Sequence, residues 1–262
     1  MRHSTGYIFL FAGAICIICA IVVCSSEVSL SELHKNNARL DKQKNILYAA
    51  GLARSSENLS SEDVQLRFGR VKAIAIHVED GELAPEIDPD FYDARKAAVD
   101  PKAGRSAPPN ASAIKRMARH AIIYHILEDS GEVGMIVLPI EGYGLWGTLY
   151  GFLALDADAK TVRGLTYYQH KETPGLGGEV DNPDWKALWP DRVAFDESGE
   201  VAIEVIKGQA GLPVGDPHRI DGLSGATITS RGVTNMLHFW LGEDGFGPYL
   251  KNFTQVNNDS IK

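Results

Sequence analysis

Residues 121–169 read AIIYHILEDSGEVGMIVLPIEGYGLWGTLYGFLALDADAKTVRGLTYYQ, and the predicted fold class follows mainly from this stretch. Runs of apolar, β-branched and aromatic residues alternate here with short turns, a pattern typical of consecutive strands. The predicted strands are Ala121–Leu127, Val133–Ile140, Leu145–Leu155 and Val162–Gln169. Tight turns join antiparallel neighbours, whereas parallel strands need long crossovers. The stretch therefore predicts an antiparallel sheet.

The flanking sequence adds further elements to this sheet. Val71–Val78 alternates with a period of two and predicts one more strand. Residues 81–113 contain five prolines and scattered glycines, which indicates a loop-rich insertion. Beyond the sheet we predict a short helix at Asp181–Trp189, a strand at Glu200–Ile206 and a last helix at Ser230–Leu241. The fold class is α+β, an antiparallel sheet with flanking helices.

The N-terminus predicts a membrane anchor over residues 1–26, embedded at about residues 6–24. No charged side chain occurs from Ser4 to Ser26. A helix of about 20 apolar residues spans a hydrocarbon core of about 30 Å. A cleaved signal peptide is the rival interpretation, but its apolar region is normally shorter and a small-residue cleavage site follows it. A lipoprotein at Cys24 is disfavoured by the bulky Val23. Charge counts on the two sides leave the orientation open.

A juxtamembrane helix is predicted at 27–54 from leucines at helical spacing. Ser29 or Ser31 is its candidate N-cap, and Gly51 suits its end. The remaining residues, 55–255, form the predicted extracytoplasmic domain. All three cysteines lie in the anchor and are interpreted as part of an apolar helix, so the domain contains neither a disulfide nor a cysteine metal site.

Composition excludes several classes of function. The chain has 262 residues and a net charge of −8, which disfavours nucleic acid as a partner. None of the eight histidines forms H-x-x-x-H or H-E-x-x-H, so no metal site is predicted. Glycine-rich nucleotide motifs are missing. Gly222–Ala226 departs from the hydrolase motif G-x-S-x-G at its last position.

The loop Glu172-Thr-Pro-Gly-Leu-Gly-Gly178 follows the last predicted strand of the sheet. Its three glycines let the backbone approach a flat ligand without interference from Cβ atoms. Thr173 and backbone N–H groups could bind a polar ring edge, and Leu176 could cover a face of the ring. A plain surface turn is the alternative interpretation of this loop.

The segment Asp221-Gly-Leu-Ser-Gly-Ala-Thr-Ile-Thr-Ser230 precedes the last predicted helix. Small residues, hydroxyls and a helix N-terminus together suit a phosphate group, since free backbone N–H groups point outward there. The alternative is a capping turn in which Thr229 or Ser230 is the N-cap. The physics alone leaves both interpretations open.

Asp221–Thr227 resembles the flavinylation motif of the FMN-binding-domain family, and Glu172–Gly178 resembles a second signature of that family, E-T-P-G-L-G. Gly142–Gly151 and Gly164–Tyr168 are similar to one branch of it, the flavin subunits of sodium-translocating NADH:quinone oxidoreductases. The resemblance covers nearly the whole chain, from the anchor to about Gly247. Both motifs are intact here.

The resemblance implies one FMN per chain, joined through its phosphate to Thr227 by a flavin transferase that uses FAD. Other residues are expected to complete the transferase recognition sequence, to lie near the isoalloxazine ring or to counter the phosphate charge. These are Asp221, Ser224, Gly225, Ala226, Leu145, Trp146, Glu172, Thr173, Gly175, Leu176, Gly177 and Lys207.

The resemblance also implies a function and a location. The chain would relay electrons between other redox subunits of a membrane complex, as part of a translocase, with its domain on the periplasmic side of a bacterial inner membrane. The flavin-carrying subunit of the Rnf ferredoxin-linked electron transport complex is the alternative within the family. A membrane-anchored binding module without flavin is the alternative from another class.

Overall fold

The structure is a computed structural model that describes residues 4–260, with side chains as far as residue 256. The chain divides into two compact units, Met1–Lys42 and Gln43–Lys262. Helix α1 (Thr5–Ala49) is long and apolar enough to cross a membrane, with a mean hydropathy of 2.9 in its most apolar window. An N-terminal signal sequence meets the same criterion.

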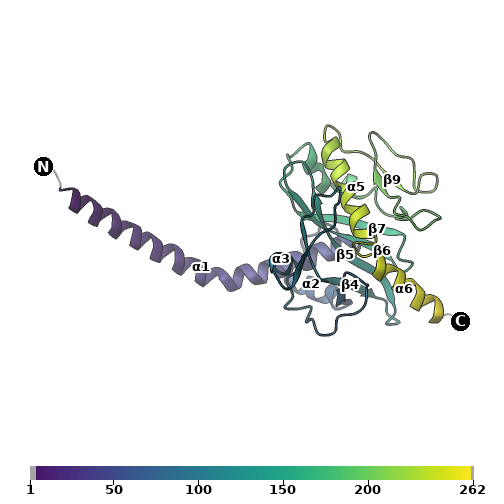
Figure 1. The fold of residues 1–262 in the computed structure, drawn as a ribbon, viewed down its shortest axis with the longest axis horizontal. Helices are drawn as coiled ribbons and strands as arrows, with labels where there is room; N and C mark the ends of the chain where they lie inside the picture. The colour runs from purple at the N-terminus through teal and green to yellow at the C-terminus, as the bar shows by residue number, and fades with distance from the viewer. Residues whose placement is uncertain (1–3, 261–262) are drawn as a thin grey trace. The chain divides into compact units, whose positions relative to one another are not determined.

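The predicted anchor and juxtamembrane helix are one uninterrupted helix (Figure 1). The prediction that Ser29 or Ser31 caps a second helix is therefore wrong, because both residues lie mid-helix with the backbone already hydrogen-bonded. The helix ends at Ala49, and Gly51 follows in the left-handed conformation, with φ +69°. Glycine adopts that conformation without a steric penalty.

The domain is built on a five-stranded sheet with the order β1-β4-β5-β6-β7. Every neighbouring pair is antiparallel, which confirms the predicted α+β class. The strands are β1 (Val71–His77), β4 (His120–Leu127), β5 (Val133–Tyr143), β6 (Thr148–Asp156) and β7 (Val162–Gln169). A smaller antiparallel pair, β2 (Gly104–Ser106) and β3 (Arg116–Ala118), lies largely within the predicted insertion.

Two predicted strands are shorter than expected. The strand predicted from Leu145 begins only at Thr148, because a tight turn, closed by Gly144 N–H donating to Gly147 O, occupies the intervening residues. The strand predicted at Glu200–Ile206 shrinks to β8 (Glu204–Val205), which pairs in parallel with β9 (Arg219–Ile220).

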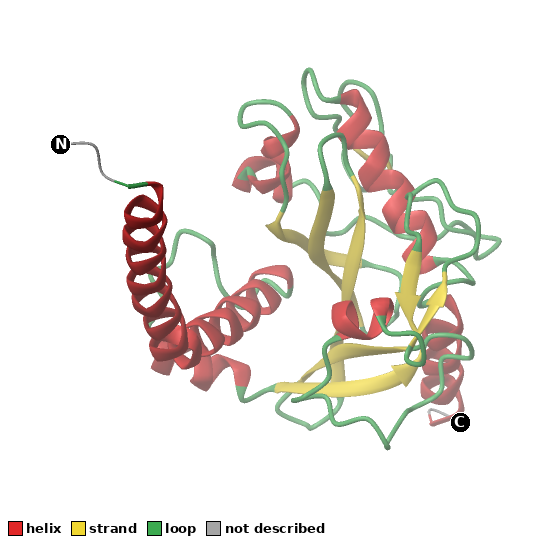
Figure 2. Ribbon diagram, turned by 60° about the vertical axis from the view of Figure 1, so that its left-hand side comes forward, coloured by secondary structure: helices red, strands yellow, loops and turns green. Residues whose placement is uncertain are grey.

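Helices cover both faces of the sheet. α5 (Thr227–Leu241) and α6 (Gly247–Ser260) pack on one face and share its core with Leu138, Leu153 and Trp189 (Figure 2). The last turn of α1 packs on the other face, together with the segment between Ala84 and Tyr92. α2 (Ser61–Phe68) and α3 (Ala94–Val99) are the remaining N-terminal helices.

Three helical predictions need correction. Ser230–Leu241 begins earlier, at Thr227, and is not the last helix, because α6 follows with Tyr249, Leu250 and Phe253 packed into the core. The helix predicted at Asp181–Trp189 is instead the 3-10 turn η1 (Gly177–Asp181) and the short helix α4 (Pro183–Lys186). Asn182 separates the last two, since its extended backbone and its side-chain bond to Asp184 N–H start a new helix.

Candidate functional site

The N-terminus of α5 has no side-chain cap. Its N-cap residue is Ala226, whose methyl group cannot accept a hydrogen bond. The first intrahelical bond runs from Ser230 N–H to Ala226 O. The backbone N–H groups of Thr227, Ile228 and Thr229 therefore lack acceptors within the helix. Such N–H groups, together with the helix dipole, form a site for an anion.

Three hydroxyls at this helix start have different environments. Thr227 is exposed, whereas Thr229 is 0% exposed and Ser230 is buried. Thr229 Oγ1 donates to Glu172 Oε2 at 2.6 Å, and Ser230 Oγ accepts from Leu223 N–H at 3.0 Å. The interpretation of Thr229 or Ser230 as the N-cap is therefore wrong, because both lie inside the first turn. Of the three hydroxyls, that of Thr227 faces solvent.

Glu172 joins three segments of the site. The residue is only 6% exposed. Its Oε1 accepts from the backbone N–H groups of Leu145 and Trp146, at 3.0 and 2.9 Å, and its Oε2 accepts from Thr229. The β5–β6 turn, the loop after β7 and the first turn of α5 therefore converge on one buried carboxylate. Each of these charge-assisted bonds is stronger than a neutral one.

Glycines make this convergence possible. A Cβ atom at Gly144 would lie 2.6 Å from Glu172 Oε1, and one at Gly177 would lie 2.5 Å from Glu172 Oε2. The role expected for the glycine-rich loop was a close approach to a ligand. At Gly177 the space is needed for Glu172 instead. Gly175 has φ +77° in open surroundings, so it serves the turn itself.

Apolar side chains surround the exposed hydroxyl. Leu145, Trp146 and Leu176 are exposed, and they belong to the two loops that Glu172 joins. Leu176 also reaches α5, because a Cβ atom at Gly225 would lie 2.8 Å from Leu176 Cδ2. Covering these side chains with a flat apolar ligand would be favourable by about 25 cal/mol for each Å² buried.

Asp221 and Lys207 lie on the other side of the motif. Asp221 Oδ1 accepts from Ala210 N–H at 2.8 Å, and Gly222 N–H donates to Gly208 O at 2.8 Å. These bonds hold the loop that carries Lys207 against the motif. Lys207 is exposed, and within the described residues its ammonium group has no ion-pair partner. It is therefore available to an anionic ligand.

A supporting hydrogen-bond chain was not predicted from the sequence. Glu172 N–H donates to His170 Nδ1 at 3.2 Å, so His170 Nε2 carries the proton and donates to Asp181 Oδ2 at 2.7 Å. Lys186 Nζ lies 3.2 Å from the other oxygen of Asp181. The only sequence signal was the proximity of His170 to the glycine-rich loop.

Comparison with known proteins agrees with this geometry. Residues 144–242 match the FMN-binding domain family, and they include every predicted site residue. A protein of Pseudomonas aeruginosa, named as the NqrC-type subunit of Na(+)-translocating NADH-quinone reductase, is 43% identical over 96% of this chain and 97% of its own length. A Yersinia pestis protein of the same name is 43% identical over 95% of this chain and 93% of its own.

Solved structures give the same result. The crystal structure of Shewanella oneidensis NqrC has a TM-score of 0.75 and 32% identity, covering 83% of this chain and 99% of the other. The crystal structure of the corresponding Na(+)-translocating NADH-quinone reductase subunit from Parabacteroides distasonis has a TM-score of 0.65 and 28% identity, covering 84% and 96%.

Fold and site thus define an FMN-binding domain that follows one long apolar helix. The chain belongs to the NqrC family, whose members are subunits of the Na(+)-translocating NADH-quinone reductase. The residues present fit FMN. An uncapped helix start suits the phosphate, the exposed hydroxyl of Thr227 lies at that start, and exposed apolar side chains are available for the ring.

Proposed function

We propose that Thr227 carries one FMN per chain through a phosphoester, and that the chain relays electrons as the flavin subunit of a sodium-translocating NADH:quinone reductase complex. The observation that carries the attachment is the contrast between neighbouring hydroxyls. Thr227 is exposed at an uncapped helix start, whereas Thr229 is buried and bonded to Glu172. An enzyme that modifies a folded or nascent site needs an accessible hydroxyl, and Thr227 offers one.

The other residues receive roles around this bond. Backbone N–H groups at the start of α5 hold the phosphate, and Lys207 adds a positive charge near it. Leu145, Trp146 and Leu176 cover the ring and exclude water from it. Thr173, Gly175 and Gly177 line the loop beside the ring. Ser224, Gly225 and Ala226, with Asp221 in front, form the recognition sequence of a flavin transferase.

FMN, when bound, supplies reversible electron transfer at its isoalloxazine ring, and the protein orients and tunes that ring. Attachment through the phosphate leaves the ring unsubstituted. A covalent bond also suits a domain outside the cytoplasm. At a dissociation constant of about 1 μM, a free-energy difference of about 8 kcal/mol, a scarce flavin would leave most sites empty. A lysine–phosphate contact adds too little to compensate.

We further infer a single-pass protein of the bacterial inner membrane with its domain on the periplasmic side, assembled with other subunits of the complex. The apolar α1 and the membership of a membrane-complex family support the membrane location. The alternative, the flavin subunit of an Rnf-type complex, is not favoured, since the relatives matched over most of the chain are named as subunits of the quinone reductase.

The test is the mass of the intact chain, produced together with a flavin transferase. Wild type should exceed its polypeptide mass by one FMN less one water, and its denatured band should fluoresce. Thr227→Ala should have the bare mass and a dark band. Thr229→Ala is the matched control and should keep the flavin. A wild-type chain without added mass, or a flavinylated Thr227→Ala variant, would refute the attachment.

A further inference from the structure

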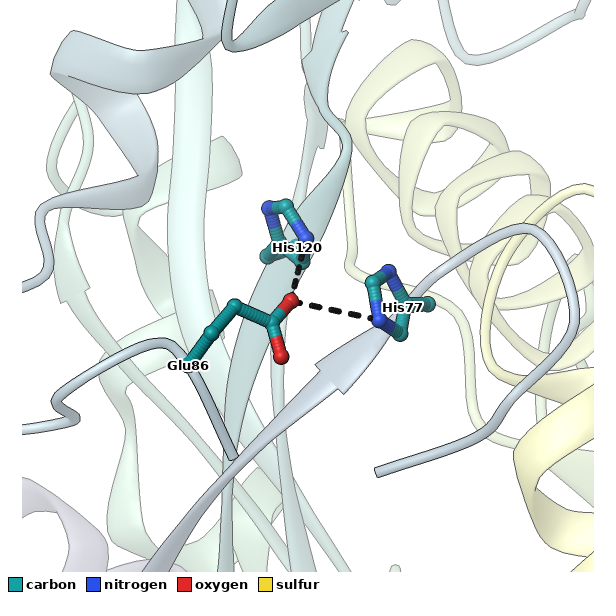
Figure 3. A group of neighbouring side chains, drawn as sticks. All are labelled: His77, Glu86 and His120. Carbon is teal, nitrogen blue, oxygen red and sulfur yellow. Dashed lines mark ion pairs between the residues drawn. The ribbon is translucent and has the colours of Figure 1, made fainter. Parts of the chain in front are cut away.

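A second cluster of polar side chains lies outside the flavin site. His77, Glu86 and His120 converge, each with one potential ligand atom within 4.8 Å of the others (Figure 3). His77 Nε2 lies 3.3 Å from Glu86 Oε1, and His120 Nε2 lies 3.5 Å from the same oxygen. The two imidazole rings are 4.6 Å apart between centroids.

Regular secondary structure holds the two histidines. His77 ends β1, His120 begins β4, and the two residues are directly opposite each other in the antiparallel register. Side chains at such positions point to the same face of a sheet. The pair therefore has little freedom to separate without disrupting the edge of the sheet.

The loop that carries Glu86 is bonded back onto β1. His77 N–H donates to Glu82 O and Ala84 N–H donates to Ala75 O, both at 2.9 Å. Ile87 N–H then donates to Ala84 O and closes a turn around Glu86. The carboxylate is thus presented to the histidines by backbone bonds, which makes the cluster organised before any ion arrives.

The spacing suits a transition-metal ion. Zinc binds imidazole nitrogen and carboxylate oxygen at about 2.0–2.2 Å, so tetrahedral ligand atoms lie about 3.3–3.5 Å apart. Both nitrogen–oxygen distances agree with that value. Two imidazoles and one carboxylate form a donor set that zinc uses with a fourth position left open. The side chains of His77 and His120 are 37% and 18% exposed, so an ion can enter from solvent.

We propose that His77, Glu86 and His120 bind one divalent transition-metal ion, with Zn²⁺ the best fit and a fourth position open to water or to a group from a neighbouring subunit. The sequence predicted no metal site because its ligands follow no compact motif. Glu86 lies 9 residues after His77 and 34 before His120. Strand pairing, not sequence proximity, assembles the set.

The test uses the full flavin-carrying chain in detergent, purified without a histidine tag and stripped of metal. Titration with Co²⁺ should give visible d–d absorption bands that saturate at one equivalent and that Zn²⁺ abolishes. Glu86→Gln and His120→Gln should weaken Co²⁺ binding by roughly tenfold or more. Glu79→Gln, an exposed carboxylate on the same turn, is the matched control and should bind as wild type does.

A second measurement separates binding from folding. Zn²⁺ should raise the melting temperature of wild type and of Glu79→Gln, because a ligand that binds the native state stabilises it. It should leave Glu86→Gln unchanged, while the metal-free melting temperatures of all three remain alike. Equal Co²⁺ affinity in wild type and Glu86→Gln would overturn the proposal, as would the lack of a saturable equivalent in wild type. Glu86 would then only accept hydrogen bonds from the two imidazoles.

Discussion

Thr229 and Glu172, 57 residues apart in the chain, are joined by a hydrogen bond of 2.6 Å that is buried from solvent. This bond ties the first turn of α5 to the loop after β7. The same carboxylate also binds two backbone N–H groups of the β5–β6 turn. The geometry of the flavin site therefore depends on a side chain that is expected to act mainly by positioning other groups.

Replacement of Glu172 should test that dependence. Glu172→Ala leaves two N–H groups and one hydroxyl without their acceptor, and we expect the free energy of unfolding to fall by about 2–4 kcal/mol. Glu172→Gln keeps an acceptor oxygen and should cost about 1 kcal/mol. Urea unfolding measures both, and flavin content should follow the same order. Equal stability of Glu172→Ala and wild type would contradict the role of Glu172 as a link.

Gly225 should resist substitution for two reasons. Its φ of +70° is unfavourable for alanine, and an added Cβ would lie 2.8 Å from Leu176. The strained backbone alone costs about 1–2 kcal/mol. Gly131→Ala is the control, because Gly131 has φ +86° with open space around it. Gly225→Ala should be the more destabilised in urea unfolding and should carry less flavin. If the two lose equal stability, Leu176 imposes no constraint.

Trp146 offers a test of the predicted ring contact. Its side chain is exposed, so Trp146→Ala should change stability by no more than about 0.5 kcal/mol. If the indole lies against the ring, its removal should increase the flavin fluorescence of the native protein. Trp189→Phe is the control, since Trp189 is buried in the core and is not predicted to touch flavin. Unchanged fluorescence in Trp146→Ala would remove this residue from the site.

His125 should make the domain sensitive to acid. Burial, with a smaller effect from the positive charge of Lys72, lowers the pKa of His125 to about 4. Its Nε2 lies 2.6 Å from Tyr249 Oη on α6. Because the unfolded histidine has a pKa of about 6.5, the unfolded chain binds more protons between these values. Stability should therefore fall by about 1–3 kcal/mol as the pH drops from about 6.5 to about 4.

The pH prediction is checked by urea unfolding at neutral pH and near pH 4. Wild type should lose more stability than His125→Gln, because glutamine keeps a polar group near Tyr249 but does not titrate. Other acidic and histidine side chains contribute equally to both proteins and cancel in the difference. An identical loss in the two proteins would assign the acid sensitivity to other groups.

Local sequence determined the elements whose physics is local. An apolar run of sufficient length predicts a helix able to span a bilayer, and Thr5–Ala49 is such a helix. Alternating apolar runs separated by tight turns predict an antiparallel sheet, and the strand Val162–Gln169 has the predicted bounds. The motif ending at Thr227 placed the candidate phosphate site at a helix start, because small and hydroxyl residues precede an amphipathic segment.

Only the tertiary structure decided which hydroxyl is exposed, which carboxylate holds the loops and which histidines meet. Thr227 and Thr229 are both threonines of one motif, and their difference comes from the approach of Glu172 across the fold. The pairing of His77 with His120 depends on the register of two strands far apart in sequence. Burial and long-range strand pairing are properties of the packed chain, so no local pattern encodes them.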